Sequence, residues 1–154
     1  ITTGTSPTTF SPSTSVTRGQ LATFLYRYAG SPTVSGGNDF VDVSPGAYYA
    51  DPVTWMVSQG ITTGTSATTF SPNDGVTRGQ LAAFLYRFAG SPAVSSEATF
   101  DDVARGAYFA TPVDFMVEQG ITTGTSPTTF SPGNPVTRGQ LATFLWRLAG
   151  EPIV

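Results

Sequence analysis

Hydrophobic and polar positions repeat three times along the chain, with a period of 60 residues. Residues 1–30, 61–90 and 121–150 share the sequence ITTGT-x-x-TTFSP-x-x-x-VTRGQLA-x-FL-x-R-x-AG. In the first copy the apolar residues fall at positions i, i+3, i+4 and i+7, which is one face of a helix; they are Leu21, Phe24, Leu25 and Tyr28. The pattern therefore predicts a long helix over about residues 18–29 and in each equivalent position.

Both ends of this long helix carry sequence signals. Thr17 followed by Gln20 is a capping box, in which each side chain bonds the backbone N–H of the other residue. Gly30 directly after the apolar stripe is a C-terminal stop. The same signals recur at residues 77–90 and 137–150.

A shorter helix is predicted twice, ahead of the second and third copies. Asp51-Pro52 and Thr111-Pro112 have the composition of an N-cap followed by the first helical residue. Gly60 and Gly120 end these helices after about two turns. The phenylalanine of each TTFSP loop is expected to insert into the hydrophobic core; these are Phe10, Phe70 and Phe130.

The repeats predict an all-α protein. Helices this short bury too little apolar surface alone, so the copies must share a core, most simply around a pseudo-three-fold axis. We expect a single domain over 1–154. Its parts are the second half of a first repeat (1–30), two whole repeats (38–90 and 98–150) and two connectors (31–37 and 91–97).

Composition excludes several function classes. The net charge is −3, whereas a nucleic-acid-binding protein needs a basic stripe, and no apolar run is long enough to span a bilayer. The absence of His and Cys removes the usual ligands of zinc and soft metals, and with them the Ser-His-Asp and Cys-His catalytic groupings. We therefore expect no metal, no cofactor and no enzymatic activity.

The ordered motifs resemble the S-layer homology domain family, whose repeat runs F-x-D-V, an aromatic, a short helix ending in G-I-x-x-G, then F-x-P and a T-R-A-E helix. The matching residues here are Phe40-Val41-Asp42-Val43, Tyr48, Trp55, Gly60-Ile61-Thr62-Thr63-Gly64, Phe70-Ser71-Pro72 and Thr77-Arg78-Gly79-Gln80, and the set recurs over Phe100–Gln140. The departure is T-R-G-Q in place of T-R-A-E, which keeps the capping box but loses an acid.

The resemblance implies a three-pronged spindle that anchors exported proteins to the bacterial cell wall. Such domains bind anionic secondary cell-wall polysaccharide, often pyruvylated, in grooves between prongs. Secretion and a cell-wall location follow from the same resemblance. The alternative function is a structural module that assembles by protein–protein contacts, as in a surface layer.

An arginine opens each long helix, where the helix dipole favours acids instead. Arg18, Arg78 and Arg138 are therefore candidates for binding a glycan carboxylate together with free helix amides. The equally weighted alternative is an internal salt bridge to Asp42 or Asp102.

Other candidate glycan-binding residues come in pairs. Trp55 and Phe115 lie off the apolar face of the short helix, so they either stack on sugars or pack against the next prong. Gly64 and Gly124 are expected to take positive φ in turns, and the resemblance suggests close backbone approach to a ligand.

Asp42 and Asp102 lie 60 residues apart in equivalent places. That placement argues against a glycosidase carboxylate pair, which needs two acids across one bond. A capping or turn role is favoured instead. In the family's pattern the two aspartates remain candidates for the glycan site.

The first repeat lacks its short helix. We expect a segment upstream of Ile1 that resembles residues 38–60, either from the parent chain or from a second copy, to complete the first prong.

Overall fold

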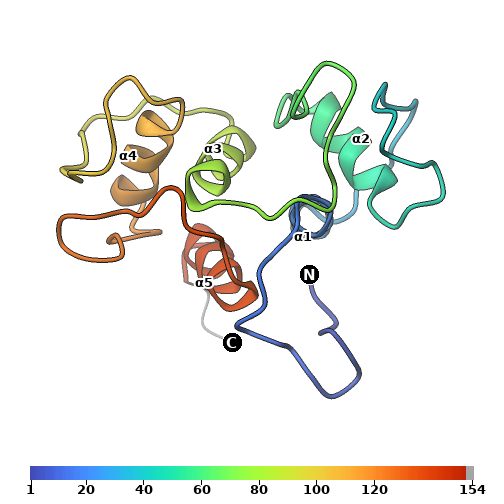
Figure 1. Cartoon of the computed structure of the whole chain (residues 1–154), viewed down its shortest axis with the longest axis horizontal. Coiled ribbons are helices and arrows are strands. Elements are labelled where there is room, and N and C mark those ends of the chain that lie inside the picture. Colours follow the sequence, from blue (N-terminus) through green and yellow to red (C-terminus); the bar gives the residue numbers. More distant parts are fainter. Residues whose placement is uncertain (152–154) are drawn as a thin grey trace. The chain divides into compact units, whose positions relative to one another are not determined.

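The computed structural model describes residues 1–151, which contain five α-helices and no β-strand longer than an isolated bridge (Figure 1). The all-α prediction is confirmed. The helices are α1 (Arg18–Tyr28), α2 (Ala50–Ser58), α3 (Arg78–Phe88), α4 (Ala110–Glu118) and α5 (Arg138–Leu148). Long and short helices alternate, as the pattern predicts.

The chain divides into two compact units. Unit 1 comprises residues 1–11 and 16–76 and contains α1 and α2. Unit 2 comprises residues 12–15 and the chain from Thr77 onward, with α3, α4 and α5. The three-fold arrangement and the single-domain organisation stay predictions.

Each long helix begins with the predicted capping box. The Thr77 hydroxyl accepts a hydrogen bond from the Gln80 backbone N–H at 3.3 Å, and the Gln80 side chain accepts one from the Thr77 N–H at 3.1 Å. The boxes at Thr17 and Thr137 are equivalent. These bonds satisfy two backbone donors that a helix start otherwise leaves unpaired, so the local sequence fixes where the long helices begin.

The next amides of each long helix bond to a loop of another repeat. In unit 1 the N–H groups of Arg18 and Gly19 donate to the carbonyls of Asp74 and Pro72, at 2.9 and 2.8 Å. In unit 2 the start of α3 pairs in the same way with Asn134 and Pro132, and the start of α5 with Thr14 and Pro12. Every long helix therefore depends on a TTFSP loop of a different repeat.

The short helices begin earlier than predicted. Their N-cap residues are Tyr49 and Phe109, without a side-chain cap bond, and Asp51 lies inside the first turn. The physical reason is packing across helices: a Cβ added to Gly19 of α1 would lie 2.9 Å from Cδ1 of Tyr49. The Tyr49 ring can lie this close to α1 only because Gly19 has no side chain. We infer that this contact determines where α2 begins.

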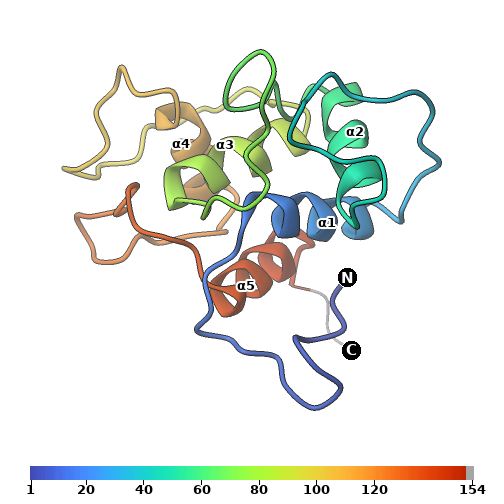
Figure 2. The same ribbon diagram turned by 45° about the vertical axis from the view of Figure 1, so that its right-hand side comes forward.

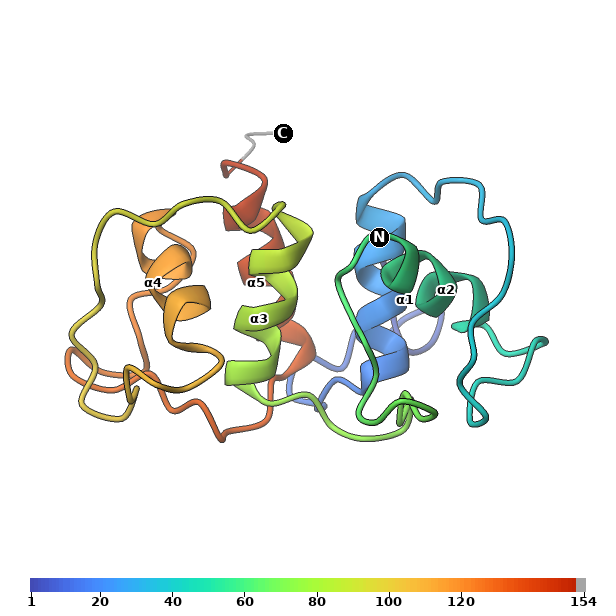
Figure 3. The same ribbon diagram turned by 90° about the horizontal axis from the view of Figure 1, so that it is seen from above.

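Each short helix packs on the long helix that precedes it in the chain. Figure 3 shows α2 alongside α1, and α4 alongside α3. Val53 and Met56 of α2 are completely buried, and the Tyr26 and Trp55 rings meet edge to face at 5.7 Å. The packing pair thus joins two successive sequence repeats.

Long loops connect the helices (Figure 2), and each TTFSP loop contains one phenylalanine. Phe70 and Phe130 are at most 1 % exposed, which confirms the predicted insertion into the core, whereas Phe10 is half-buried. Gly30, Gly60 and their equivalents have positive φ after the helices, as predicted.

Gly79→Ala is expected to destabilise the protein by about 1–3 kcal/mol, because the new methyl group meets the Phe109 ring at 2.9 Å. The matched control is Gly139→Ala, where the three nearest atoms among the described residues all belong to Pro12, at 3.2 Å or more, and none of them to an aromatic ring. There the gain in helix propensity, about 1 kcal/mol, opposes the tight contact. Urea unfolding followed by circular dichroism compares the two; equal losses of stability would contradict the role of the ring.

Candidate functional site

The three predicted arginines are buried. Arg18, Arg78 and Arg138 have relative exposures of 4, 4 and 5 %. In unit 1 the Nε–H of Arg18 donates to the Phe70 carbonyl at 2.6 Å, and the guanidinium lies 4.6 Å from the centre of the Phe70 ring. A cation over a ring face is attracted by the ring's quadrupole, so one phenylalanine provides both contacts.

Unit 2 repeats this geometry. Arg78 Nε–H donates to the Phe130 carbonyl at 2.7 Å, and the guanidinium lies 4.5 Å from the Phe130 ring and 5.6 Å from the Phe144 ring. The arginine at the start of α1 and of α3 thus holds a loop through its side chain. Other carbonyls of the same loop accept hydrogen bonds from the first backbone amides of that helix.

The aspartates of the F-x-D-V segments hold the same phenylalanines from the other side. Asp42 accepts from the backbone N–H groups of Phe70 and Ser71, at 2.8 and 2.7 Å. Asp102 accepts from Phe130 and Ser131 at the same distances. Ser71 has a φ of +57°, a conformation that L residues rarely adopt, and the carboxylate stabilises it. The role of these aspartates is therefore structural, as favoured from the sequence, but the bonds reach a loop 28 and 29 residues further along the chain and are not those of a local turn or helix cap.

We call this arrangement the Asp–Phe–Arg cluster: Asp42, Phe70 and Arg18 in unit 1, and Asp102, Phe130 and Arg78 in unit 2. In unit 2 no carboxylate oxygen of residues 1–151 lies within 4 Å of Arg78. The direct salt bridge considered from the sequence is thus wrong for Arg78; the Asp102 carboxylate instead accepts from the backbone N–H groups of Phe130 and Ser131.

Burial leaves the positive charge of Arg78 only partly compensated. It lowers the pKa of the Arg78 guanidinium from its ordinary value, and the nearby Asp102 charge only partly opposes this. The Nη2 atom is buried and has no hydrogen-bond partner among the described residues. A buried donor without a partner is unfavourable, so an anion or water reaching this atom would stabilise the charged form.

Of the two alternatives for the aromatic residues of the short helices, packing is the one that the structure shows. Trp55 and Phe115 are 7 and 4 % exposed, and they meet Tyr26 and Tyr86 edge to face. Their position off the apolar face of the short helix is explained by the neighbouring long helix, which covers that side. In this structure the rings pack and do not face solvent.

Gly64 and Gly124 have the predicted positive φ, at +89° and +91°. A Cβ at Gly64 would lie 2.5 Å from the Phe40 ring and 2.5 Å from the Thr69 carbonyl. The protein's own packing therefore already requires glycine here.

A hydroxyl cluster beside each glycine was not anticipated from the sequence. The Thr65 hydroxyl pairs with those of Thr69 and Ser71, at 3.0 and 2.7 Å, and Thr69 also pairs with Ser66. The loops at residues 5–11 and 125–131 have the same bonds. The signal that marks this cluster is the spacing of Thr and Ser in ITTGTS-x-TTFSP.

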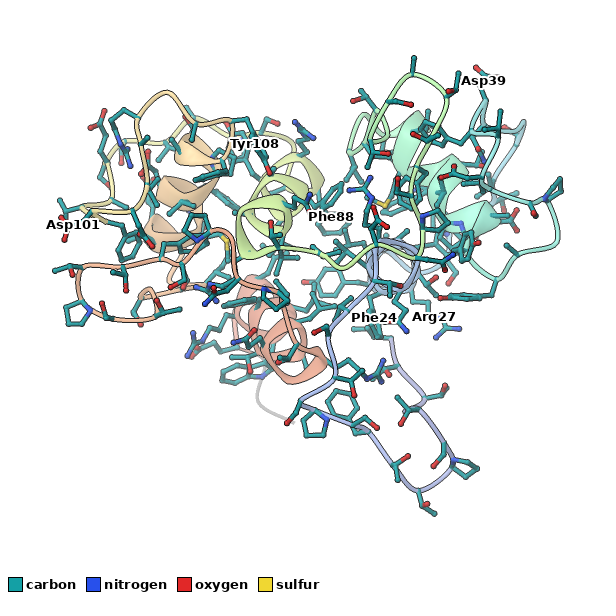
Figure 4. The ribbon with its side chains drawn as sticks, in the orientation of Figure 1. Phe24, Arg27, Asp39, Phe88, Asp101 and Tyr108 are labelled. Carbon is teal, nitrogen blue, oxygen red and sulfur yellow. The ribbon has the colours of Figure 1, made fainter. Side chains whose placement is uncertain are left out.

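A hollow of about 290 Å³ lies in unit 1, between the end of α1 and the segment ahead of α2. Its lining includes Thr23, Arg27, Tyr48 and Asp51. Tyr48 is 63 % exposed; burial of its hydroxyl end and the neighbouring Tyr49 raise the pKa of this phenol, opposed by a hydrogen bond with Thr17. Figure 4 shows Arg27 on the outer side of α1.

Unit 2 differs at the equivalent face. Arg105 replaces Pro45, and it forms an ion pair of 2.9 Å with the buried Asp114. In unit 1 the corresponding positions hold Thr54, bonded to Asn38 at 2.9 Å. The two inter-repeat faces therefore share a backbone but not their chemistry.

Comparison with known proteins identifies this arrangement. Residues 39–82 and 99–142 match the family model of the S-layer homology domain. These segments make up more than half of the sequence, and the chain belongs to the S-layer homology domain family.

Two relatives share the segment. An endoglucanase of Bacillus sp. (strain KSM-635) is 38 % identical over 103 residues, covering 67 % of this chain and 11 % of the relative. The surface-layer 125 kDa protein of Lysinibacillus sphaericus is 30 % identical over 139 residues, covering 86 % of this chain and 12 % of the relative. The chain thus corresponds to a small part of much longer proteins.

Within residues 1–151 no helix is long and apolar enough to cross a bilayer. The same residues contain no group of three or more acidic, His or Cys side chains that would hold a metal ion.

Asp42→Asn is expected to destabilise the protein by about 1–3 kcal/mol, because an amide cannot accept both backbone N–H groups and loses the charge. The control is Asp39→Asn, at an exposed residue on the outer edge of the loop ahead of α2 (Figure 4). Thermal unfolding checks the difference, and hydrogen exchange should show faster exchange at the amides of Phe70 and Ser71. Equal behaviour of the two variants would rule out the role given to Asp42.

Proposed function

We propose that this chain is a non-catalytic module that anchors its parent protein to the bacterial cell wall. It binds an anionic secondary cell-wall polysaccharide, including pyruvylated forms. The observation that carries this proposal is the shared segment: a surface-layer protein and an endoglucanase, with different names and tasks, have in common a region that is only 12 and 11 % of their length. A module that occurs in proteins of such different kinds is expected to determine where the parent protein is located and not to catalyse a reaction.

The hollow of unit 1 is the proposed place for a sugar. It lies between repeats, it offers the exposed ring of Tyr48 for stacking on a sugar face, and Arg27, Asp51 and Thr23 provide polar groups around the ring. Arg27 supplies the positive charge that an acidic sugar requires.

The Asp–Phe–Arg cluster supports the site from within. The buried arginines hold the loops in place, and Nη2 of Arg78 offers a charge-assisted hydrogen bond to a carboxylate that reaches it. Arg18, Arg78 and Arg138 thus remain proposed glycan-site residues, with Asp42, Asp102, Gly64 and Gly124 shaping the loops. Trp55 and Phe115 contribute by packing the helix pairs.

More than one binding face in one protein strengthens weak binding through multivalency, since the second contact becomes intramolecular, even where the faces differ in their side chains. The proposed location follows: a secreted protein at the cell surface. Completion of the first prong by an upstream segment or a second copy belongs to the same proposal.

Assembly into a surface layer is the second candidate function. The surface-layer relative favours it, as does the 82 % exposed Val41. Light scattering of the glycan-free protein over a range of concentrations separates the two functions. An assembly module is expected to form larger particles as the concentration rises, whereas an anchoring module can remain monomeric.

The chain is expected to sediment with purified Gram-positive cell-wall sacculi and to lose most of this binding when the secondary polymer is stripped from the walls. The reason is that the proposed ligand is the secondary polymer and not the peptidoglycan. A pull-down with both wall preparations measures this, with the polymer released from the walls as competitor. Undiminished retention on stripped walls would refute the proposed ligand.

The double variant Tyr48→Ala, Arg27→Ala is expected to weaken wall binding by about ten-fold or more, the effect of losing one stacking ring and one charge-assisted bond. Both side chains are exposed, so the melting temperature should change little. Val41→Ala, at an exposed position outside the hollow, is the control. Wall binding equal to that of the control would remove the hollow from the site.

A further inference from the structure

The hollow of unit 1 contains two side chains of opposite charge. Arg27 belongs to the last turn of α1 and Asp51 to the first turn of α2, and both are exposed. Among the described residues no carboxylate oxygen lies within 4 Å of the Arg27 guanidinium, so the two charges do not pair with each other. The polar contact of Arg27 is with the Ile1 carbonyl, at 3.5 Å. Both charged groups are therefore accessible to a ligand in the hollow.

The acid is not needed to form α2. An aspartate in the first turn of a helix interacts favourably with the helix dipole, which by itself would account for Asp51. However, Thr111 occupies the equivalent position of α4, and α4 also begins at an alanine and also has nine residues. Because the two short helices form alike with and without the acid, the charge of Asp51 is better explained by the hollow that it faces.

The equivalent face of unit 2 keeps the cation and the ring but not the acid. Arg87 and Tyr108 are the counterparts of Arg27 and Tyr48, and all four side chains are exposed. Thr111, which replaces the acid, is exposed and uncharged. A ligand carboxylate beside Arg87 thus meets no negative charge at this position, whereas the same position is negative in unit 1.

Arg105 does not change this comparison, because its own charge is compensated. Its guanidinium lies 2.9 Å from the buried Asp114 carboxylate and 4.0 Å from that of Glu97. For a charged ligand, the difference between the two faces is therefore concentrated at position 51 and its counterpart 111.

We propose that Asp51 determines the specificity of the unit 1 hollow, and that the hollow takes a sugar which carries a free amine as well as a carboxylate. Arg27 binds the carboxylate, Asp51 binds the protonated amine, and the Tyr48 ring lies against the sugar face. This inference rests on the proposed function, because it assigns the hollow to a glycan, and it adds the chemical class of the sugar.

Charge complementarity favours such a ligand over a purely acidic or a neutral one. A carboxylate bound to Arg27 without an accompanying amine is repelled by Asp51, and the repulsion offsets part of what Arg27 contributes. A neutral sugar donates hydroxyl groups to Asp51 but leaves the charge of Arg27 without a counter-ion. Only a sugar with both groups satisfies both sides of the hollow.

The test compares two sugars that differ only at the amine. Muramic acid carries a carboxylate and a free amine, and in N-acetylmuramic acid an uncharged amide replaces the amine. Each sugar is titrated at neutral pH into the isotope-labelled full chain, and NMR shifts of the Tyr48 and Asp51 amides give the affinity. Muramic acid is expected to bind about two- to five-fold more tightly, the effect of one exposed charge contact.

Asp51→Thr, which introduces the residue that α4 has, is the decisive variant. It should abolish the preference for muramic acid without weakening the binding of N-acetylmuramic acid. Thr111→Asp is the reciprocal variant, and it should create the same preference in the shifts of the Tyr108 amide. Both positions are exposed, so both variants should fold, which circular dichroism checks. Asp51→Asn, which keeps the shape of the side chain, replaces Asp51→Thr if that chain does not fold.

Three results would overturn the proposal. They are equal binding of the two sugars to the unaltered chain, a preference that persists in Asp51→Thr, and the absence of shifts with either sugar. Equal binding would assign Asp51 to sugar hydroxyls instead of an amine. The wall pull-down separates this failure from failure of the proposed function. Polymer-dependent retention on walls, together with equal binding of the two sugars, removes only the role of Asp51. Loss of wall retention with the amine preference intact removes only the proposed anchoring.

Discussion

The fold depends on a guanidinium that is buried without a carboxylate to pair with it in unit 2. Taking an arginine out of water is unfavourable unless its donors are satisfied. Arg78 meets this requirement in part, with the carbonyl and ring of Phe130, a residue 52 positions away in the next repeat, while its Nη2 has no hydrogen-bond partner among the described residues. The Asp102 carboxylate accepts a hydrogen bond from the backbone N–H of the same phenylalanine. The start of α3 and the loop that contains Phe130 therefore stabilise each other.

This constraint explains why the sequence repeat and the packing unit are out of phase. The repeat read along the chain joins a short helix to the long helix that follows it, whereas in space the short helix packs on the long helix before it. A single sequence repeat therefore cannot bury its own apolar faces. Stability arises between repeats, as in other repetitive folds, and any long helix whose neighbour is absent retains an exposed face.

The features that the sequence predicts well are local ones. The capping box at Thr77 needs only residues three apart, and the positive φ of Gly64 follows from its turn, so both are confirmed. The start of α2 is missed because the ring of Tyr49 on Gly19 sets it, a contact between distant segments. The partner of Arg78 is missed for the same reason: charge suggests Asp102, but backbone N–H groups already occupy that carboxylate.

The internal cluster and the surface follow different rules in the two units. Phe70 and Phe130 are held by the same set of bonds, residue for residue, because that geometry is required for packing. At the inter-repeat faces, by contrast, unit 1 has a hollow bordered by Pro45, and unit 2 has Arg105 bonded to Asp114. An arginine neutralised by a buried carboxylate offers less charge to an acidic sugar than the exposed Arg27 does. Arg87 of α3, the equivalent of Arg27, is exposed as well, so the two units share this cation and differ in the residues around it.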